Sequence, residues 1–237
     1  MAKVVVFTGA GVSAESGIST FRESDGLWEE YDVSVVCNYD SLEKNEALTL
    51  EFYDKRRADL VDKEPNYAHR VLQELKEKYG DSIAIITQNV DNLFEKAGLQ
   101  QEELIHLHGF LPEVRCQNEM CGKIYNIGYE KIASCNNGLC LSCGEKLRPN
   151  IVFFGESAPM YELLNKEIQD CEFFVVIGTS GNVIGVNTIA AFCDYSILNN
   201  LEPSNAIDET LFSRVFYEKA TNAIEEIREE IEAYFSE

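Results

Sequence analysis

Cysteines are the first residues whose type and spacing point to chemistry. Cys116 and Cys121 form one pair, and Cys140 and Cys143 form a second pair further along the chain. Two close pairs of thiols are typical of a zinc ribbon, in which four thiolates hold one structural Zn²⁺ in a tetrahedral site. Cys135 is a fifth candidate, so the predicted set is either these four or one in which Cys135 replaces a member. We expect the others to be small buried side chains: Cys37, Cys171 and Cys193.

Polar side chains follow two apolar segments, at the points where predicted strands end. Gln88, Asn89 and Asp91 come after one such segment, and His108 comes after the next. Open α/β sheets place their ligand sites at the carboxyl ends of the strands, so these residues are candidates for a site. By pattern alone His106 is an equal candidate, and Asn and Asp are also common in turns that bond to themselves.

Glycines follow the first apolar segment, where a helix is expected to begin. Gly9, Gly11 and Gly17 lie directly after residues 3–8. Glycines at such a junction let the backbone approach a pyrophosphate at a helix N-terminus. The spacing differs from the general dinucleotide fingerprint, so a tight turn from strand to helix is the alternative.

The elements that must position these residues alternate between strand and helix. Apolar segments of strand length occur at 3–8, 82–87, 104–107, 151–154 and 173–177, with a weaker one at 196–198. Apolar residues at helical spacing occur over 67–79 and near the end of the chain, at Ile224, Ile227, Ile231 and Phe235. This alternation predicts an α/β fold with a Rossmann-like parallel sheet that is covered by helices on both faces.

Two stretches interrupt the alternation. Residues 37–79 are largely helical and charged, and residues 113–148 contain five of the eight cysteines. We expect the two stretches to pack together as a smaller domain of helices and a zinc ribbon. The large domain would then consist of residues 1–36, 80–112 and 149–237, and the two domains together would form a single catalytic core.

The charge of the chain argues against some classes of protein. Twenty Lys and Arg residues against 41 Asp and Glu residues give a net charge of −21. Affinity for nucleic acid rests on clustered basic residues, so a nucleic-acid partner is not expected, whereas basic protein substrates would be attracted. No segment reaches the ~18 apolar residues of a membrane helix, and the N-terminus lacks a signal-peptide cleavage site. We expect a cytoplasmic monomer.

A series of short motifs gives the most specific indication. They occupy residues 9–17, 21–22, 25–28, 87–91, 106–109, 147–149, 154–156, 178–180 and 200–203. In this order they resemble the sirtuin family, the NAD-dependent protein-lysine deacylases, and the resemblance covers essentially the whole chain. The chain departs from the family pattern at Phe94, where many members have His, and at Ser19, where Pro is frequent. Neither position is the catalytic base, so we expect changes in packing rather than a loss of activity.

The resemblance implies a reaction and assigns residues to it. NAD would be consumed, and the products would be nicotinamide, free lysine and 2′-O-acyl-ADP-ribose. His108 would be the general base, with Asn89 and Asp91 completing the catalytic set, and acyl-lysine proteins or peptides would be the partners. The zinc would be structural. The implied NAD-binding residues are Gly9, Ala10, Gly11, Ala14, Glu15, Phe21, Arg22, Gln88, Asn89, Asp91, Gly178, Thr179, Ser180, Asn200, Leu201, Glu202 and Ala220.

One pair of residues bears on the acyl group. Tyr53 and Arg56 are three residues apart, so on a helix they project from the same face. The pair is similar to the hallmark of the class III sirtuins, which bind the carboxylate of succinyl, malonyl or glutaryl groups with that Tyr and Arg. Alternatives are a solvated helix face on which Arg56 pairs with acidic neighbours, a lysine deacetylase, and an NAD glycohydrolase or ADP-ribosyltransferase on the same scaffold.

Overall fold

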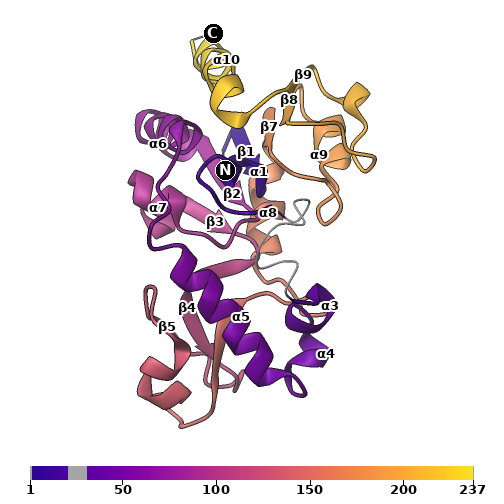
Figure 1. The fold of residues 1–237 in the computed structure, drawn as a ribbon. Helices are drawn as coiled ribbons and strands as arrows, with labels where there is room; N and C mark the ends of the chain where they lie inside the picture. The colour runs from indigo at the N-terminus through magenta and orange to yellow at the C-terminus, as the bar shows by residue number, and fades with distance from the viewer. Residues whose placement is uncertain (1, 21–30, 237) are drawn as a thin grey trace.

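The larger of two sheets carries the strand ends that the sequence singles out. The computed structural model describes residues 2–20 and 31–236. Within this part of the chain, six parallel strands lie in the order β3-β2-β1-β7-β8-β9 (Figure 1). The strands are β1 (Val4–Thr8), β2 (Ile83–Thr87), β3 (Leu104–His106), β7 (Phe173–Ile177), β8 (Tyr195–Asn200) and β9 (Arg214–Tyr217). The predicted Rossmann-like parallel sheet is confirmed.

Helices cover both faces of this sheet because successive side chains of its strands point to opposite sides. Val4 and Val6 of β1 pack with the helices α6 (Tyr67–Tyr79) and α10 (Ala220–Tyr234). Val5 and Phe7 pack with residues of α8 (Tyr161–Ile168) and α9 (Val186–Phe192). The central strands β1, β2 and β7 are therefore almost entirely apolar, as strands buried on both faces require.

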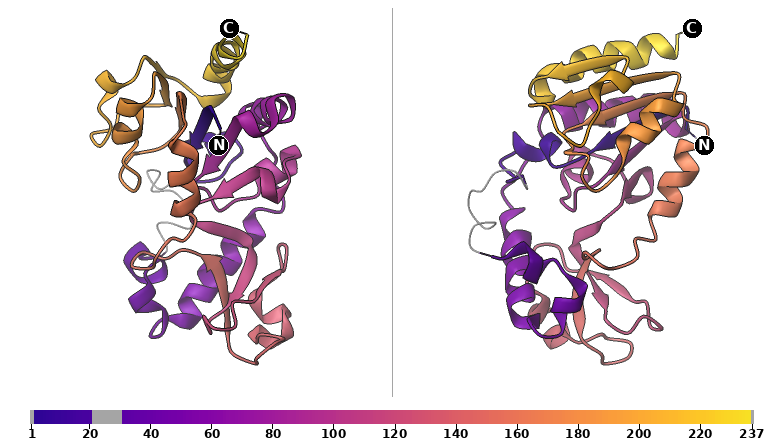
Figure 2. Two further views of the ribbon diagram at one scale, coloured as in Figure 1. Left: turned by 180° about the vertical axis from the view of Figure 1, so that it is seen from behind. Right: turned by 90° about the vertical axis from the view of Figure 1, so that its right-hand side faces the viewer.

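A smaller antiparallel sheet lies in the second part of the molecule (Figure 2). Its order is β5-β4-β6, and its strands are β4 (Gly109–Cys116), β5 (Ile124–Asn126) and β6 (Leu147–Ile151). An apolar cluster joins this sheet to helices from residues 33–59. These helices are α3 (Val33–Val36), α4 (Tyr39–Leu42) and α5 (Glu46–Asp59).

Short helices connect these elements. The α-helices among them are α1 (Gly11–Ala14) and α7 (Leu93–Ala97). The 3₁₀ helices are η1 (Gly80–Ser82), η2 (Gln101–Glu103), η3 (Ile132–Ser134), η4 (Asn136–Gly138) and η5 (Glu209–Leu211).

Two expectations about the elements are wrong. Helix α6 was assigned to the smaller domain, but its apolar face, with Val71 and Leu72, lies in the core of the large sheet beside α10. Residues 151–154 were expected to form a strand like the others, but β6 ends at Ile151, and Phe153 packs in the cluster around α5. An apolar segment can be buried without belonging to a sheet.

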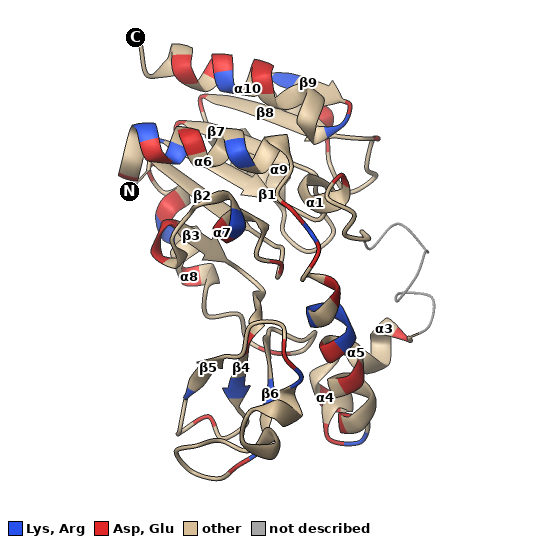
Figure 3. Cartoon of the chain, turned by 60° about the vertical axis from the view of Figure 1, so that its left-hand side comes forward, with Lys and Arg blue, Asp and Glu red and all other residues tan. Residues whose placement is uncertain are grey.

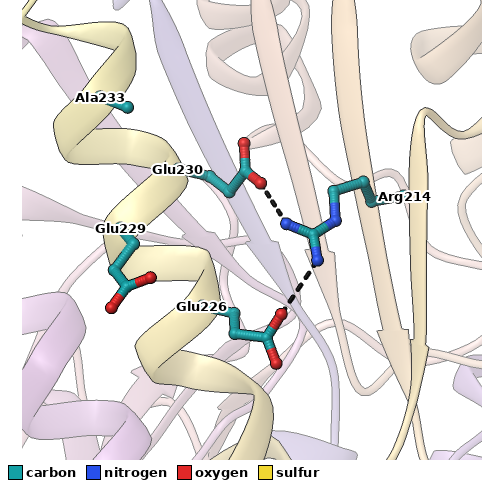
Figure 4. Close-up of a pocket in the computed structure, with 5 residues that line it drawn as sticks. All are labelled: Arg214, Glu226, Glu229, Glu230 and Ala233. Atoms are coloured by element: carbon teal, nitrogen blue, oxygen red, sulfur yellow. Dashed lines mark hydrogen bonds and ion pairs between the residues drawn. The ribbon is translucent and has the colours of Figure 1, made fainter.

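Charged residues on the outer helices pair with one another across the surface. Acidic side chains are spread over both parts of the molecule, and α6 and α10 carry charges of both signs (Figure 3). Arg214 of β9 forms ion pairs with Glu226 and Glu230 of α10 (Figure 4). These residues, with Glu229 and Ala233, line a hollow of about 250 Å³. Predicted site residues are not among those that line it, so it is not the candidate site.

Over the described residues, no helix is both long and apolar enough to cross a membrane.

Candidate active site

The glycine loop after β1 fits against the loop after β7. Gly9 N–H donates to the carbonyl of Ile177, and Gly11 N–H donates to the carbonyl of Gly178 at 2.8 Å. A Cβ atom on Gly11 would lie 2.6 Å from Cα of Gly178, and one on Gly9 would lie 2.7 Å from the Gly178 oxygen. Gly178 itself has a φ of +68°. The close approach of two backbones therefore accounts for glycine at these three positions.

Ser13, in helix α1 directly after this loop, connects it to the segment after β2. Its buried hydroxyl donates to Asp91 Oδ2 at 2.9 Å and accepts from Asn89 Nδ2 at 3.0 Å. His69 Nε2 lies 3.4 Å from the same oxygen. Because the one hydroxyl proton goes to Asp91, the Nε2–H of His69 is the donor in this contact. The catalytic candidates Asn89 and Asp91 are thus held by one shared hydroxyl.

Asp91 is buried in this network. Its Oδ1 also accepts from the backbone N–H of Leu93 at 3.1 Å. Burial raises the pKa of Asp91, while the bonds from Leu93 and Ser13 act in the opposite direction. Burial of a carboxylate with only part of its hydrogen-bonding capacity satisfied is typical of a residue that faces a charged ligand.

His108 follows β3 and is partly buried. Its Nδ1 lies 3.1 Å from the carbonyl oxygen of Gln88, and its Nε2 lies 3.1 Å from the hydroxyl of Tyr161 on α8. A carbonyl only accepts, so Nδ1 carries the proton and Nε2 has a lone pair. Burial lowers the pKa of His108 below 6.5. The ring is therefore neutral at pH 7 and can accept a proton at Nε2.

His106 has a different environment. Its Nδ1 bonds to the carbonyl of Asn89 and its Nε2 to Glu95 Oε1, both at 2.8 Å. Burial acts to lower its pKa, but the bond to Glu95 prevails and the pKa of His106 is raised. A protonated imidazole paired with a carboxylate has no lone pair to offer as a base. His106 positions the backbone of Asn89, and of the two histidines His108 has the geometry of a base.

The remaining NAD candidates line the carboxyl ends of neighbouring strands. Gln88 Nε2 donates to Thr179 Oγ1 at 2.8 Å, which links the loops after β2 and β7. At the end of β8, Asn200 is buried, and its Nδ2 has no hydrogen-bond partner in the described part of the chain. Glu15 accepts from the backbone N–H of Thr221 at the start of α10.

The other members of the predicted set lie along these loops. Ala10 directly precedes α1, and Ala14 is the last residue of that helix. Ser180 follows Thr179, and Ala220 begins α10. Leu201 and Glu202 are exposed beyond β8. Phe21 and Arg22 lie outside the described residues.

Tyr53 and Arg56 lie on α5, the long helix of the smaller part. Tyr53 is buried, and its hydroxyl donates to Cys37 Sγ at 3.5 Å. Burial lowers the pKa of the Arg56 guanidinium, and the charges that oppose this effect include Tyr53 and Asp91. The guanidinium carbon of Arg56 lies 5.7 Å from the centroid of the Phe52 ring on the same helix. The neighbouring Arg57 is the fully buried arginine of this helix and pairs with Asp54.

The four cysteines of the two spaced pairs come together. Cys116 at the end of β4, Cys121, Cys140 and Cys143 have their sulfur atoms within 4.8 Å of one another. Four thiolates at this separation suit one tetrahedral Zn²⁺. In the described residues this cluster does not include Cys135, which favours the first of the two predicted sets.

Some residues of the site were missed by sequence reasoning. Ser13 lies within the first motif, and a hydroxyl directly after the glycine loop is the signal that marks it. His69 lies within a predicted helix, and its contact with Ser13 depends on how α6 packs. Tyr161 carried no signal, because it reaches His108 from a helix 53 residues further along the chain.

Comparison with known proteins identifies the family. The Sir2 family model matches residues 9–185. An NAD-dependent protein deacylase of Campylobacter jejuni (strain RM1221) is 45% identical over 238 residues, which cover 100% of this chain and 99% of that protein. A protein of the same name from Helicobacter hepaticus is 42% identical, and the match covers 99% of this chain and 99% of that protein.

Solved structures agree with this family. A Sir2 homologue in complex with NAD has a TM-score of 0.83 and 31% identity, with 98% of this chain and 90% of that one covered. A Sir2 homologue variant in complex with ADP-ribose has a TM-score of 0.84 and 30% identity. The match covers 98% of this chain and 93% of that one. The predicted sirtuin resemblance is confirmed, and this chain belongs to the Sir2 family of NAD-dependent protein deacylases.

Proposed function

We propose that this deacylase acts mainly on lysines that carry an acidic acyl group: succinyl, malonyl or glutaryl. The observation that carries the proposal is the placement of Tyr53 and Arg56 three residues apart on α5, with the Arg56 guanidinium carbon 5.7 Å from the centroid of the Phe52 ring. A guanidinium that is partly withdrawn from water can bind an anion with charge-assisted hydrogen bonds. A carboxylate at the end of the acyl chain would supply that anion, with a charge-assisted bond to the guanidinium and a further bond to the phenol.

The loops at the carboxyl ends of β1, β2, β7 and β8 would hold NAD. The unpartnered Nδ2 of Asn200 offers a buried donor, and Gln88 and Thr179 place polar side chains beside it along the sheet edge. Glycine at positions 9, 11 and 178 would let the ligand approach the backbone of these loops without a side chain in the way. The Sir2 homologue solved with NAD supports this assignment. Other members of the predicted NAD set lie in the described part of the chain and would bind NAD with these residues: Ala14, Glu15, Ser180, Leu201, Glu202 and Ala220. Phe21 and Arg22 are the further members of the proposed set.

When bound, NAD supplies a ribose carbon that accepts the acyl oxygen as nicotinamide leaves. His108 would then remove a proton from a ribose hydroxyl through Nε2, the nitrogen that the hydroxyl of Tyr161 contacts. Its Nδ1–H remains on the carbonyl of Gln88, which keeps the ring in the required tautomer. Positioned general bases are typically worth ~10²–10⁴ in rate. Asn89 and Asp91, held by Ser13, would orient the ribose and nicotinamide.

Substrate and NAD would meet between the two sheets. The acyl-lysine would approach from the side of α5, which carries Tyr53 and Arg56, and NAD from the ends of the large sheet. A related Sir2 protein was solved with 2′-O-acetyl-ADP-ribose and a deacetylated peptide, which supports acyl-lysine peptides as the substrate class. The zinc of the cysteine cluster would hold β4 and the turns of the smaller part and would take no part in the chemistry.

Two other functions remain candidates. A lysine deacetylase would use the same NAD site without a charged group at the end of the acyl tunnel. An NAD glycohydrolase or ADP-ribosyltransferase would release nicotinamide without an acyl-lysine peptide. Arg56 favours an acidic acyl group over acetyl, because its guanidinium can donate charge-assisted bonds to a carboxylate and an acetyl group has none.

A panel of peptides separates these functions. One lysine in one peptide sequence would carry acetyl, propionyl, malonyl, succinyl or glutaryl groups, and kcat/KM would be measured from nicotinamide release. We expect the acidic groups to be the best substrates and little release without peptide. Higher kcat/KM for acetyl-lysine would contradict the acyl preference but not the deacylase activity, whereas release that is independent of peptide would point to a glycohydrolase.

A further inference from the structure

A second close pair of cysteines lies away from the zinc cluster. Cys171 precedes β7 by two residues, and Cys193 precedes β8 by two residues. Their Sγ atoms are 3.5 Å apart. Both lie at the amino ends of parallel strands, whereas His108 follows the carboxyl end of β3. The pair is therefore at the opposite edge of the sheet from the NAD and acyl-lysine site.

The register of the two strands explains why the thiols meet. Phe173 of β7 lies opposite Tyr195 of β8, so the two cysteines stand opposite each other when the same register is continued. Neighbouring strands are about 4.8 Å apart, within the range of Cα separations that a disulfide spans. Formation of a bond of about 2.05 Å would need a shift of the sulfur atoms of only about 1.5 Å.

We propose that Cys171 and Cys193 form a dithiol site that reacts with small uncharged disulfides and closes into an intramolecular disulfide, independently of the zinc cluster. Cys193 is partly exposed and follows Phe192, which is 84% exposed, so a small reagent can reach its sulfur. Cys171 is buried behind it, with its Sγ also 3.4 Å from the carbonyl oxygen of Phe173. Cys193, the more accessible thiol, attacks the reagent disulfide first, and Cys171 then attacks the mixed disulfide that has formed on Cys193.

The electrostatics of the pair agree with this order. A hydrogen bond to Cys171 lowers the pKa of the Cys193 thiol, although burial and the Asp194 carboxylate act against the shift. The pKa of Cys171 is raised, by its bond to Cys193 and by burial. Thiolate is the reactive form, so Cys193 is the better nucleophile of the two.

The reaction has two exchange steps. In the first, the Cys193 thiolate attacks one sulfur of the reagent, a protein–reagent disulfide forms, and one thiolate leaves and takes a proton from water. In the second, Cys171 loses its proton to solvent and attacks the Cys193 sulfur, and the second reagent thiol leaves. The protein loses two electrons and two protons, and the reagent disulfide is reduced to two thiols.

The charge near the site decides which reagents react. Asp194 adjoins Cys193, and the net charge of the chain is −21. An anionic disulfide would be repelled, so 2-hydroxyethyl disulfide, which is small and uncharged, is the probe of choice.

The experiment treats the full-length, zinc-loaded protein with 2-hydroxyethyl disulfide and follows intact mass, non-reducing peptide maps, zinc content and the unfolding temperature. We expect a mass loss of two hydrogens, a Cys171–Cys193 cross-link, retained zinc, and a rise in Tm of roughly 5–10 °C. Cys171→Ser should retain the reagent on Cys193 as a stable adduct. Cys193→Ser should form neither an adduct at residue 193 nor a cross-link to Cys171. Because position 193 is partly exposed, this variant is the test to use if Cys171→Ser does not fold.

Cys135→Ser is the matched control, because Cys135 is partly exposed and outside both pairs. It should oxidise like the unmodified chain. A cross-link among the zinc cysteines with loss of zinc, or a stable adduct on Cys193 while Cys171 is present, would overturn the proposal.

Discussion

Ser13 Oγ donates a hydrogen bond of 2.9 Å to Asp91 Oδ2, which joins the loop after β1 to the segment after β2. The same oxygen accepts from Asn89, so one hydroxyl orients two residues that we assign to catalysis. The bond is buried, and neither partner can exchange it for water without a change in the loops. The geometry of the site therefore depends on a side chain that need not touch the substrate.

Ser13→Ala should weaken both the site and the fold. Removal of the hydroxyl leaves Asp91 and Asn89 short of a buried partner, at a cost of about 1–3 kcal/mol. We expect a lower urea midpoint at an unchanged m-value and a lower kcat. Ser236→Ala, which removes an exposed hydroxyl near the C-terminus, is the control. If both variants behaved alike, the shared hydroxyl would have no role in positioning.

His108→Ala should abolish peptide-dependent turnover, with a loss of about 10²–10⁴ in kcat, while far-UV circular dichroism is unchanged. The reason is the loss of the lone pair at Nε2.

The unmodified enzyme needs the neutral ring, and burial lowers the pKa of His108 below 6.5, so kcat should be flat near pH 7 and fall only as the pH drops below 6.5. A variant that kept full activity would place the base elsewhere.

Glu95→Gln should destabilise the protein in a pH-dependent way. The pKa of His106 is raised in the folded state, so its pair with Glu95 stabilises the protein fully below the unfolded value of 6.5. That stability is lost as the pH rises through the folded pKa. The variant should therefore lose more stability at pH 6 than at pH 9, by about 1–3 kcal/mol in urea unfolding. Glu77→Gln, on the exposed face of α6, should show no such difference.

Cys140→Ser should release zinc and destabilise the smaller part of the molecule. Structural zinc contributes directly to folding, so removal of one of four ligands should lower Tm and zinc content together. Cys135→Ser should keep one zinc per chain, since its sulfur is not in the cluster of four. If Cys135→Ser lost zinc while Cys140→Ser retained it, Cys135 would be a zinc ligand in place of Cys140. Metal analysis and thermal unfolding make the comparison.

The central strands were predictable because their sequences carry an unambiguous signal. β1, β2 and β7 are buried on both faces, and only a run of apolar residues satisfies that environment. β9 was missed because it is short and only partly buried. The apolar run at 151–154 was misread, since Phe153 is buried as part of a loop and not in a strand.

For the site, the sequence predicted the side chains but not how they are held. Asp91 and His108 follow strand ends, and this position alone marks them. The hydroxyl that binds Asp91 comes from a helix at the start of the chain, and the one that contacts His108 comes from α8. Such partners are set by packing over long sequence distances, and no local pattern encodes them.

Arg56→Met tests the acyl preference most directly. The guanidinium lies on α5, three residues from Tyr53, and we propose that it binds the carboxylate of the acyl group. Methionine keeps much of the length and the apolar stem of arginine but removes the charge and its donors. Loss of charge-assisted bonds worth ~1.5–3 kcal/mol should reduce kcat/KM for succinyl-lysine by roughly 10–150-fold. Activity on acetyl-lysine should change much less, because that substrate has no carboxylate to bind.

The control for this substitution is Lys55→Met, on the same helix. Lys55 is exposed and pairs with Glu51, so its removal changes the charge of α5 by the same amount and leaves the Arg56 guanidinium in place. It should leave the ratio of succinyl to acetyl activity unchanged. Equal losses on both substrates in Arg56→Met would mean that Arg56 supports the fold or the NAD site, and the preference for acidic acyl groups would then have to come from elsewhere. A change in the ratio confined to Arg56→Met, with KM for NAD unaltered, is the result expected if the guanidinium binds the acyl carboxylate.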